Sequence, residues 1–379
     1  MLHNITTECI IGRRSVTVKR QSHITLDDIA KKLKVSRVSV SKALRGHPDI
    51  SEKTAKRILK TASDLGYSPN FIARNLSARQ SNMLGVVIPK VAHFFFGSVI
   101  ESIYNTAFEN NYETILTVSQ ENAERERKHI QTLVSMRVDG IIISISQQTR
   151  DTEIFKWIKK MGIHVVFVDR MPEPPVPGFS SVMVDDRGGA FNAVEQAIKV
   201  GYRKIGFVGG NPLVSIGKNR LLGFEQAMKE HDVPIKREWI VHSGFGKDDG
   251  YAGFKQLYQA GKLPEFVFAV TYPVALGMYE AAKELGLRIP EDVDVICFGD
   301  SDVNRFLSPP LSCVHQPTQE LGTKAVQMIL EMIRKPDEVR EQHVEIPTEL
   351  ILRETCIRKT PILVESLNAI GAKKIAITS

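Results

Sequence analysis

Four side chains on one predicted helix have the chemistry and the spacing to read DNA bases. Arg37, Val38, Ser41 and Lys42 fall on the side of segment 36–46 that lies opposite its apolar positions. In the major groove, arginine and lysine can donate hydrogen bonds to guanine, and valine can contact the methyl group of thymine. Outward side chains on the first turns of the second helix of a helix-turn-helix reach these base edges. The pattern therefore predicts a DNA-reading helix.

Two further predicted helices position this segment. Apolar residues recur at i, i+3, i+4 and i+7 within residues 26–33, which indicates a helix with a single apolar face. Ser36 is a suitable N-cap for the reading helix and Gly46 ends it, while Ser51 begins a third helix that Gly66 stops. The hydroxyl groups that can bind DNA phosphates are those of Thr25, Ser36, Ser41 and Thr54, and Arg45 completes the expected DNA contacts on these helices.

Charge is distributed unevenly along the chain. Residues 1–81 contain 16 Lys or Arg against 6 Asp or Glu, a net charge of +10, whereas the remaining 298 residues contain 34 against 37, a net charge of −3. Three short amphipathic helices are common in helical domains, and a run of charge is often only a solvated face. Here the basic residues coincide with the helix pattern that needs them, which favours double-stranded DNA as a partner.

Composition argues against several other classes of protein. No apolar stretch approaches the roughly 20 residues of a membrane span, and residues 1–20 lack the continuous apolar region of a secretory signal. We therefore expect a cytoplasmic protein with no membrane partner. The cysteines show no CxxC spacing, so we expect neither a metal site nor a disulfide framework, and no cofactor. They are Cys9, Cys297, Cys313 and Cys356.

Several segments of the chain together resemble a known family. They read LDDIAKKLKVSRVSVSKAL, ISEKTAKRILKTASDLGYSPN and IARNLSARQSNMLGVVIP, followed by VDG at 138–140 and HQP at 315–317. In combination these motifs are specific, and the chain resembles the lactose-repressor/galactose-repressor (LacI/GalR) family of bacterial transcription regulators over roughly residues 24–356.

The resemblance implies a hinge helix after the third helix, one that folds only on operator DNA. Here the hinge would span residues 70–78, with Asn70 as its cap, Ala73 among its DNA contacts and Leu76 as the apolar wedge between base steps in the minor groove. An isolated helix of about nine residues is too short to be stable in water, so it needs a partner surface. The alternative is that Leu76 is an ordinary interface leucine.

From residue 84 onward, short β-branched runs alternate with amphipathic helices, which is typical of parallel βαβ units. The clearest predicted strands are LGVVIP, YETILTV, GIIISI, HVVFV, KIGFVGG, FVFAV and VDVICF. Two such sheets in series indicate an α/β fold with two doubly wound parallel lobes of the periplasmic-binding-protein type. The resemblance places 82–184 and a returning segment near 317–343 in the first lobe, and 187–312 with a strand near 347–353 in the second.

The predicted organisation has five parts. They are an N-terminal extension (1–22), a helix-turn-helix DNA-binding domain (23–69), a hinge helix and linker (70–81), a two-lobed effector-binding and dimerisation core (82–356) and a C-terminal extension (357–379).

A ligand of such a core lies at the carboxyl ends of the strands, between the lobes. The resemblance places eight side chains on effector-contact or cleft positions: Phe95, Phe96, Asp169, Arg170, Arg220, Phe245, Tyr272 and Asp300. Two alternatives stay open: Phe95 and Phe96 can equally be a helix-packing pair, and Arg220 and Asp169 can form a structural salt bridge across the cleft.

Two positions depart from the family pattern. Thr271 and Tyr272 stand where most members have an Asn-Asp pair, and Gly299 stands where they have an aspartate. Those acids and amides bind sugar hydroxyls, since a buried hydroxyl needs a fixed partner. Their absence makes an ordinary monosaccharide effector less expected. Either Asp300 or Asp302 takes over this role, or the pocket accepts a phosphorylated, aromatic or larger saccharide ligand.

Two rival classes fit the residues less well. An enzyme is not expected, because GFVGGNP is not G-x-G-x-x-G and the chain has no Walker A, G-x-S-x-G or H-E-x-x-H motif. A periplasmic solute binder would need a signal peptide. We therefore expect a non-enzymatic homodimeric transcription regulator, a repressor that binds a palindromic operator and responds to a carbohydrate-related or other metabolite. The alternatives are an activator, or control by a non-sugar or protein co-effector.

Overall fold

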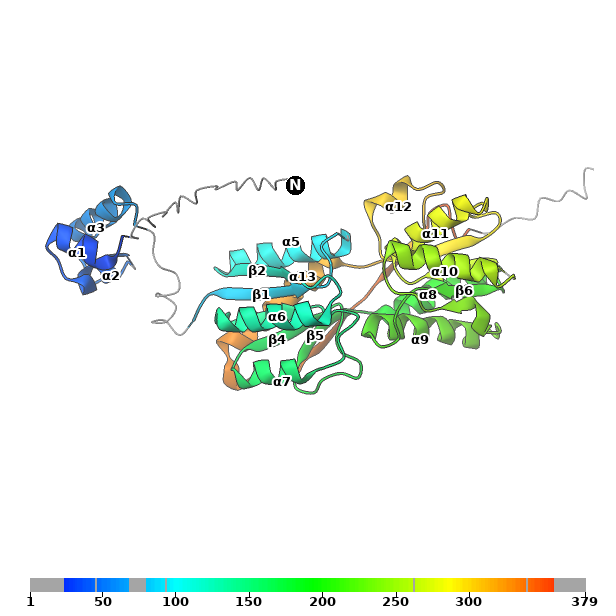
Figure 1. The fold of residues 1–379 in the computed structure, drawn as a ribbon, viewed down its shortest axis with the longest axis horizontal. Helices are drawn as coiled ribbons and strands as arrows, with labels where there is room; N and C mark the ends of the chain where they lie inside the picture. The colour runs from blue at the N-terminus through cyan, green and yellow to red at the C-terminus, as the bar shows by residue number, and fades with distance from the viewer. Residues whose placement is uncertain are drawn as a thin grey trace, which may run out of the picture. The chain divides into compact units, whose positions relative to one another are not determined.

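The computed structural model describes residues 24–44, 46–67, 80–92, 94–261, 263–338 and 340–357. The chain divides into two compact units, Met1–Gln80 and Ser81–Ser379 (Figure 1). The predicted hinge helix over 70–78 and nearly all of both predicted extensions lie outside the described residues.

Three helices form the first unit: α1 (Leu26–Leu33), α2 (Arg37–Leu44) and α3 (Glu52–Asp64). The hydroxyl groups of Thr25 and Ser51 accept backbone N–H groups at the starts of α1 and α3, which satisfies donors that have no partner inside the helix. Ile29, Val40 and Ile58, one from each helix, are fully buried in a single apolar cluster. This structure confirms the predicted three-helix domain.

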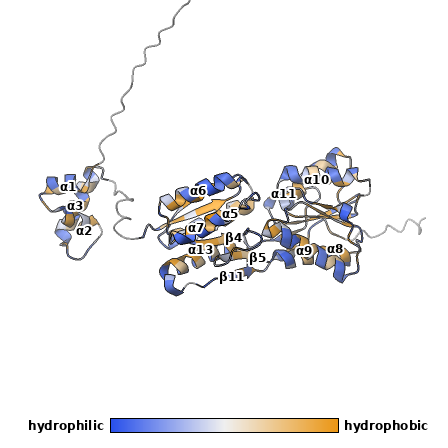
Figure 2. Ribbon diagram, turned by 60° about the horizontal axis from the view of Figure 1, so that its bottom comes forward, coloured by the Kyte–Doolittle hydropathy of each residue, from blue (hydrophilic) through white to orange (hydrophobic). Residues whose placement is uncertain are grey.

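A six-stranded parallel sheet in the order β11-β5-β4-β3-β1-β2 forms the first lobe of the second unit. Its strands are β1 (Met83–Ile88), β2 (Glu113–Val118), β3 (Gly140–Ile143), β4 (His164–Val168), β5 (Ser180–Val184) and β11 (His343–Ile346). Helices α5 (Phe94–Glu109) and α13 (Thr318–Arg334) pack on one face, and α6 (Ala123–Ser135) and α7 (Glu153–Lys160) pack on the other (Figure 1). Both faces are covered, and the central strands β1, β3 and β4 are nearly continuous apolar runs (Figure 2).

The second lobe has a six-stranded sheet in the order β12-β10-β9-β8-β6-β7, in which only β12 is antiparallel to its neighbour. Its strands are β6 (Ile205–Val208), β7 (Ile240–Val241), β8 (Phe266–Ala269), β9 (Asp294–Phe298), β10 (Cys313–His315) and β12 (Glu349–Ile351). Its helices are α8 (Asp186–Lys199), α9 (Ser215–Glu230), α10 (Lys247–Gln259), α11 (Tyr272–Glu284) and α12 (Asp302–Phe306), with short 3-10 turns at Arg237–Trp239 (η1) and, after α13, Pro336–Glu338 (η2). Helices α8 and α9 pack together, as do α10 and α11 (Figure 1).

The chain crosses between the lobes three times, from β5 to α8, from β10 to α13 and from β11 to β12. All seven predicted strands are present, and the predicted pair of doubly wound lobes is confirmed. The returning segment continues through β11 to Ile346, somewhat beyond the expected residue 343. Within the described ranges, no helix is long and apolar enough to cross a membrane.

Candidate DNA-reading helix and effector cleft

The exposed face of α2 presents two of the side chains that the sequence predicts to read bases. The side chain of Arg37 is 67% exposed and Val38 is 63% exposed, whereas Val40 and Ala43 of the same helix are buried. The Nη1 atom of Arg37 lies 3.8 Å from the carboxylate of Asp27, an exposed ion pair of the kind that contributes little free energy. Arg37 is therefore able to exchange this partner for a DNA base.

The other predicted DNA contacts on these helices already bind neighbouring side chains. Lys42 and Ser41 are half-buried, and the Lys42 ammonium lies 2.7 Å from Asp49, which holds the pKa of that carboxyl below its usual value. The hydroxyl groups of Thr25, Ser36 and Thr54 bond to Asp28, Ser39 and Ser51 respectively. Arg45, Asn70, Ala73 and Leu76 lie outside the described residues.

Arg170 is the centre of the predicted effector cleft. It follows β4 in the first lobe, is 3% exposed, and its Cζ lies 5.7 Å from the ring centre of Phe96 and 4.7 Å from that of Phe245. Phe96 lies in the first turn of α5 in the first lobe, and Phe245 lies between β7 and α10 in the second. The guanidinium is thus placed between aromatic rings of both lobes, a geometry that is attractive electrostatically.

Phe95 and Phe96 make an edge-to-face pair with ring centres 5.2 Å apart. Phe96 is buried in the apolar core of the first lobe, and Phe95 is partly buried against the same core. The packing alternative therefore describes Phe96 well, and its contact with Arg170 also places it beside the cleft.

Carboxylates neutralise Arg170 on its other side. Its Nη1 donates to Glu121 at 2.9 Å, and its Nε lies 3.5 Å from Asp169. Burial raises the pKa of Asp169, while the charge of Arg170 opposes the rise. The second oxygen of Glu121 accepts the N–H of Gln147, so this network also fixes the loop after β3. Glu121 was missed from the sequence because it lies 49 residues from Arg170.

Glu126 is a second buried carboxyl beneath the same loop. It accepts the N–H of Ser146 at 2.6 Å and the hydroxyl of Thr149 at 2.6 Å. Burial raises the pKa of Glu126 to about 7, against the effect of these hydrogen bonds. The sequence carried a signal for the burial of Glu126, because this residue shares the buried stripe of Ile130 and Leu133 at i, i+4 and i+7.

Arg220 is paired inside the second lobe and not across the cleft. Its Nε and Nη2 lie 2.8 and 2.7 Å from Oδ1 of Asp186, and its Nη1 donates to the carbonyl of Val270 at 2.7 Å. Within the described part of the chain, the ion pair of Asp169 is with Arg170. The proposed salt bridge between Arg220 and Asp169 is therefore wrong, and the partner is Asp186.

Tyr272 connects the two lobes directly. Its hydroxyl oxygen accepts the backbone N–H of Phe94, the first residue of α5, at 2.8 Å. Burial raises the pKa of Tyr272, so the phenol stays protonated at neutral pH. The ring lies beside Gly299, where an added Cβ would sit 3.6 Å from Cδ1 of Tyr272. The two departures from the family pattern are thus neighbours in space.

Asp300 binds the protein itself. Both of its carboxylate oxygens accept from Nη2 of Arg353, at 2.9 and 3.0 Å, and this pair holds the pKa of Asp300 below its usual value despite burial. Its oxygens are therefore directed to the segment after β12, and the expectation that Asp300 replaces the missing family aspartate gains no support from this geometry.

Two family models match the chain. The model for bacterial regulatory proteins of the lacI family matches residues 25–70, and the model for a periplasmic binding protein-like domain matches residues 194–356. The ribose operon repressor of Haemophilus influenzae is 30% identical over 333 residues, which cover 87% of this chain and 98% of that protein. The chain belongs to the LacI family of bacterial regulatory proteins.

Other LacI-family proteins match along the same length. The HTH-type transcriptional repressor PurR of Haemophilus influenzae strain PittEE is 30% identical over 335 residues, covering 87% of this chain and 98% of that protein. Among solved structures, the lac repressor dimer bound to operator superposes with a TM-score of 0.76 at 22% identity, covering 88% of this chain and 99% of that one. As a LacI-family member, the chain is a DNA-binding transcription regulator with an effector-binding core.

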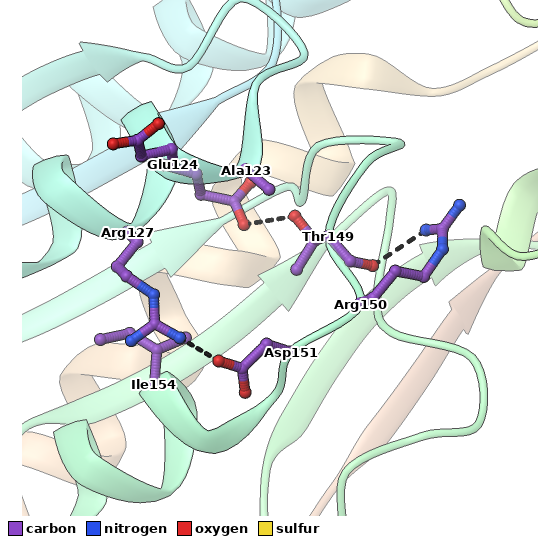
Figure 3. Close-up of a pocket in the computed structure, with 8 residues that line it drawn as sticks. Ala123, Glu124, Arg127, Thr149, Arg150, Asp151 and Ile154 are labelled. Atoms are coloured by element: carbon purple, nitrogen blue, oxygen red, sulfur yellow. Dashed lines mark hydrogen bonds and ion pairs between the residues drawn. The ribbon is translucent and has the colours of Figure 1, made fainter.

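Two surface cavities of this LacI-family core lie apart from the predicted effector residues. One, of about 190 Å³, is lined by Glu126, Arg127, Thr149 and Asp151, and an ion pair between Arg127 and Asp151 crosses it (Figure 3). The other, of about 280 Å³, lies between α13 and Asn110. None of the eight predicted effector residues lines either cavity.

Among the described residues, no cluster of three or more His, Cys, Asp or Glu is placed to hold a metal ion.

Proposed function

We propose that this LacI-family regulator is a repressor that binds a palindromic operator as a homodimer, and that a small molecule bound between the lobes changes its operator affinity. The observation that carries the proposal is the exposed base-reading face of α2, with Arg37 and Val38, on a chain whose core has two lobes that meet at Arg170. The names of its relatives, a ribose operon repressor and an HTH-type transcriptional repressor designated PurR, support repression.

Two copies are needed because one recognition helix reads only a few base pairs, and two half-sites give useful specificity. The core offers apolar surface for such an assembly. Tyr104 and Phe108 of α5 stack with ring centres 6.3 Å apart and are 50% and 62% exposed, and Phe306 of α12 is 84% exposed. Exposed aromatic side chains of this size commonly mark protein interfaces. We assign them to the contact between two copies.

The side chains of the cleft favour an effector with an apolar face. Its predicted cations, Arg170 and Arg220, are already paired with carboxylates, whereas the ring of Phe95 is only partly buried. Aromatic rings of this kind pack against sugar rings or flat aromatic metabolites. We therefore propose a carbohydrate-related or other metabolite held mainly by ring faces. Activation, or control by a non-sugar or protein co-effector, remains the alternative, and the site of action is the cytoplasm.

Selection of bound sequences from a random pool of DNA duplexes tests this proposal. The full chain is used alone and with candidate sugars, sugar phosphates and purines. We expect enrichment of a palindrome, and one ligand class should strengthen or abolish the enrichment. The matched control is Arg37→Ala, which should lose enrichment while the protein stays folded. A wild-type pool that shows no palindrome with any candidate ligand would contradict the proposal.

A further inference from the structure

The N-terminus of α5 is capped by a side chain from the other lobe. Phe94 is the first residue of α5, so its backbone N–H has no acceptor inside the helix. Helices usually satisfy such donors with a Ser, Thr, Asp or Asn at the N-cap. Here the hydroxyl oxygen of Tyr272, 178 residues away at the start of α11, accepts this N–H at 2.8 Å.

The space around Gly299 lets Tyr272 reach across. The ring of Tyr272 is only 8% exposed, and a Cβ on Gly299 would lie 3.6 Å from its Cδ1 and 3.2 Å from Oε1 of Gln316. The distance to Tyr272 is an ordinary van der Waals contact, and the distance to Gln316 is tight. Gly299 has a φ of +99°, a conformation that favours glycine. Tyr272 and Gly299 therefore form a complementary pair.

The contact lies away from one chain crossover and beside another. In the first sheet, β1 precedes α5 and is three strand positions from β5, where the chain leaves the lobe, a spacing of roughly 14 Å. The crossover from β10 to α13 is close to the contact, because the Thr318 hydroxyl lies 2.7 Å from that of Ser98 on α5 and Gln316 lies beside Gly299. The hydrogen bond between Tyr272 and Phe94 must break when the lobes separate there by more than about an ångström.

We propose that Tyr272 is an interlobe bridge that stabilises the closed arrangement of the lobes without any ligand atom, by capping α5 through Phe94. Both partners of the bond belong to the protein, so the bridge forms without an effector. An effector can shift an equilibrium only by its differential affinity for the two states. The bridge therefore sets the fraction of molecules that are already closed before the effector binds, and the effector can close only the remainder. This inference rests on the proposed function of the cleft.

Hydrogen–deuterium exchange of the full chain, without DNA or effector, tests the bridge. The variant is Tyr272→Phe, which keeps the ring and removes the hydroxyl group. The matched control is Tyr279→Phe on the same helix, whose hydroxyl donates to the carbonyl of Pro309 within the second lobe. Two amides are followed: Phe94, and Met171 of the first lobe, which donates to Ser215 of the second lobe at 3.1 Å.

In Tyr272→Phe, we expect both amides to exchange about two- to tenfold faster, the change in an opening equilibrium that corresponds to one net hydrogen bond. Tyr279→Phe should leave both rates unchanged. Faster exchange at Phe94 alone would show that Tyr272 caps the helix locally without holding the lobes together, and this would overturn the proposal. Unchanged exchange rates in Tyr272→Phe, or equal changes in both variants, would also overturn it. None of these results depends on operator binding, so failure of the bridge and failure of the proposed repressor function are distinguishable.

Discussion

Arg220 and Asp186 form a buried ion pair that joins two helices and a strand of the second lobe. Two guanidinium nitrogens lie 2.7 and 2.8 Å from one carboxylate oxygen, and the side chains are 2% and 3% exposed. The third nitrogen binds the carbonyl of Val270 at the end of β8, and Cζ lies 3.7 Å from the ring centre of Phe298. The pair therefore fixes α8 immediately after the chain enters this lobe.

Replacing Arg220 with methionine should lower the free energy of unfolding by about 3–5 kcal/mol. Removing one partner of a buried pair leaves the other charge without compensation, and this costs more than the pair itself contributes. Urea denaturation followed by circular dichroism measures the change. The matched control is Lys199→Met, which breaks an exposed pair with Glu195 and should cost less than about 1 kcal/mol. If both variants lose equal stability, Arg220 is not a structural residue of this kind.

Glu126 should make stability depend on pH in an unusual direction. Its pKa is about 7 in the folded protein against an ordinary value of 4.5, because the carboxyl is buried. Between these values the folded state holds a proton that the unfolded chain has released. The contribution of Glu126 is therefore fully present below pH 4.5 and is lost as the pH rises through 7, a loss of about 3 kcal/mol.

The variant Glu126→Gln separates this effect from other titrations. Its amide can accept from the Ser146 N–H and donate to the Thr149 hydroxyl, so both hydrogen bonds survive and the group no longer titrates. The stability of the wild type relative to the variant should fall between pH 4.5 and 8, as measured by urea denaturation at each pH. Glu124→Gln, an exposed change on the same helix, should give a curve parallel to the wild type. A parallel curve for Glu126→Gln would show that Glu126 does not carry the proton.

Local sequence patterns were sufficient for most of the fold. The helices of the helix-turn-helix domain follow from apolar spacing and N-cap residues, and the predicted strands follow from buried β-branched runs bounded by turns. Strand β7 has only two residues, Ile240–Val241, and β12 is a short edge strand with an exposed glutamate, so neither has a readable period. Their existence depends on pairing with a neighbouring strand, which a local pattern does not contain.

The cleft was only partly predictable because its partners come together through tertiary packing. Family resemblance placed Arg170 and Phe245 near the cleft, and the structure brings them to 4.7 Å. Asp300 was expected to face a ligand, yet it pairs with Arg353, 53 residues further along the chain. The change at Tyr272 was visible as a departure from the family pattern, but nothing in the sequence indicates that its hydroxyl binds the backbone of Phe94.

Arg37→Ala should reduce affinity for the selected operator about 10- to 100-fold, since a side chain that reads a base contributes roughly 1–3 kcal/mol of discrimination. Non-specific binding should fall much less, because it depends on the number of phosphate contacts. Fluorescence anisotropy across a salt series, with operator and scrambled duplexes, measures both. Lys60→Ala removes one charge from the exposed surface of α3 and serves as the control. Equal losses on both duplexes would place Arg37 on the DNA backbone and not on a base.

Phe306 should be essential for the contact between two copies. Its side chain is 84% exposed, and burying a phenylalanine contributes about 1.5–3 kcal/mol, so covering this ring would stabilise the contact between two copies. Phe306→Glu would place an unpaired charge in the interface, and we expect the dimer dissociation constant to rise by about 100-fold or more. Sedimentation velocity over a range of concentrations measures this change.

The control for this prediction is Met161→Glu, at the end of α7, where the side chain is 52% exposed. It adds the same charge at another exposed apolar site and should leave the dimer intact. If the dimer survives Phe306→Glu, the next candidates are Tyr104 and Phe108, the stacked pair on α5. Phe108→Glu then tests whether the dimer contact lies on the first lobe. If neither variant separates the two copies, the exposed rings do not form the dimer contact, and operator symmetry must arise from another surface of the core.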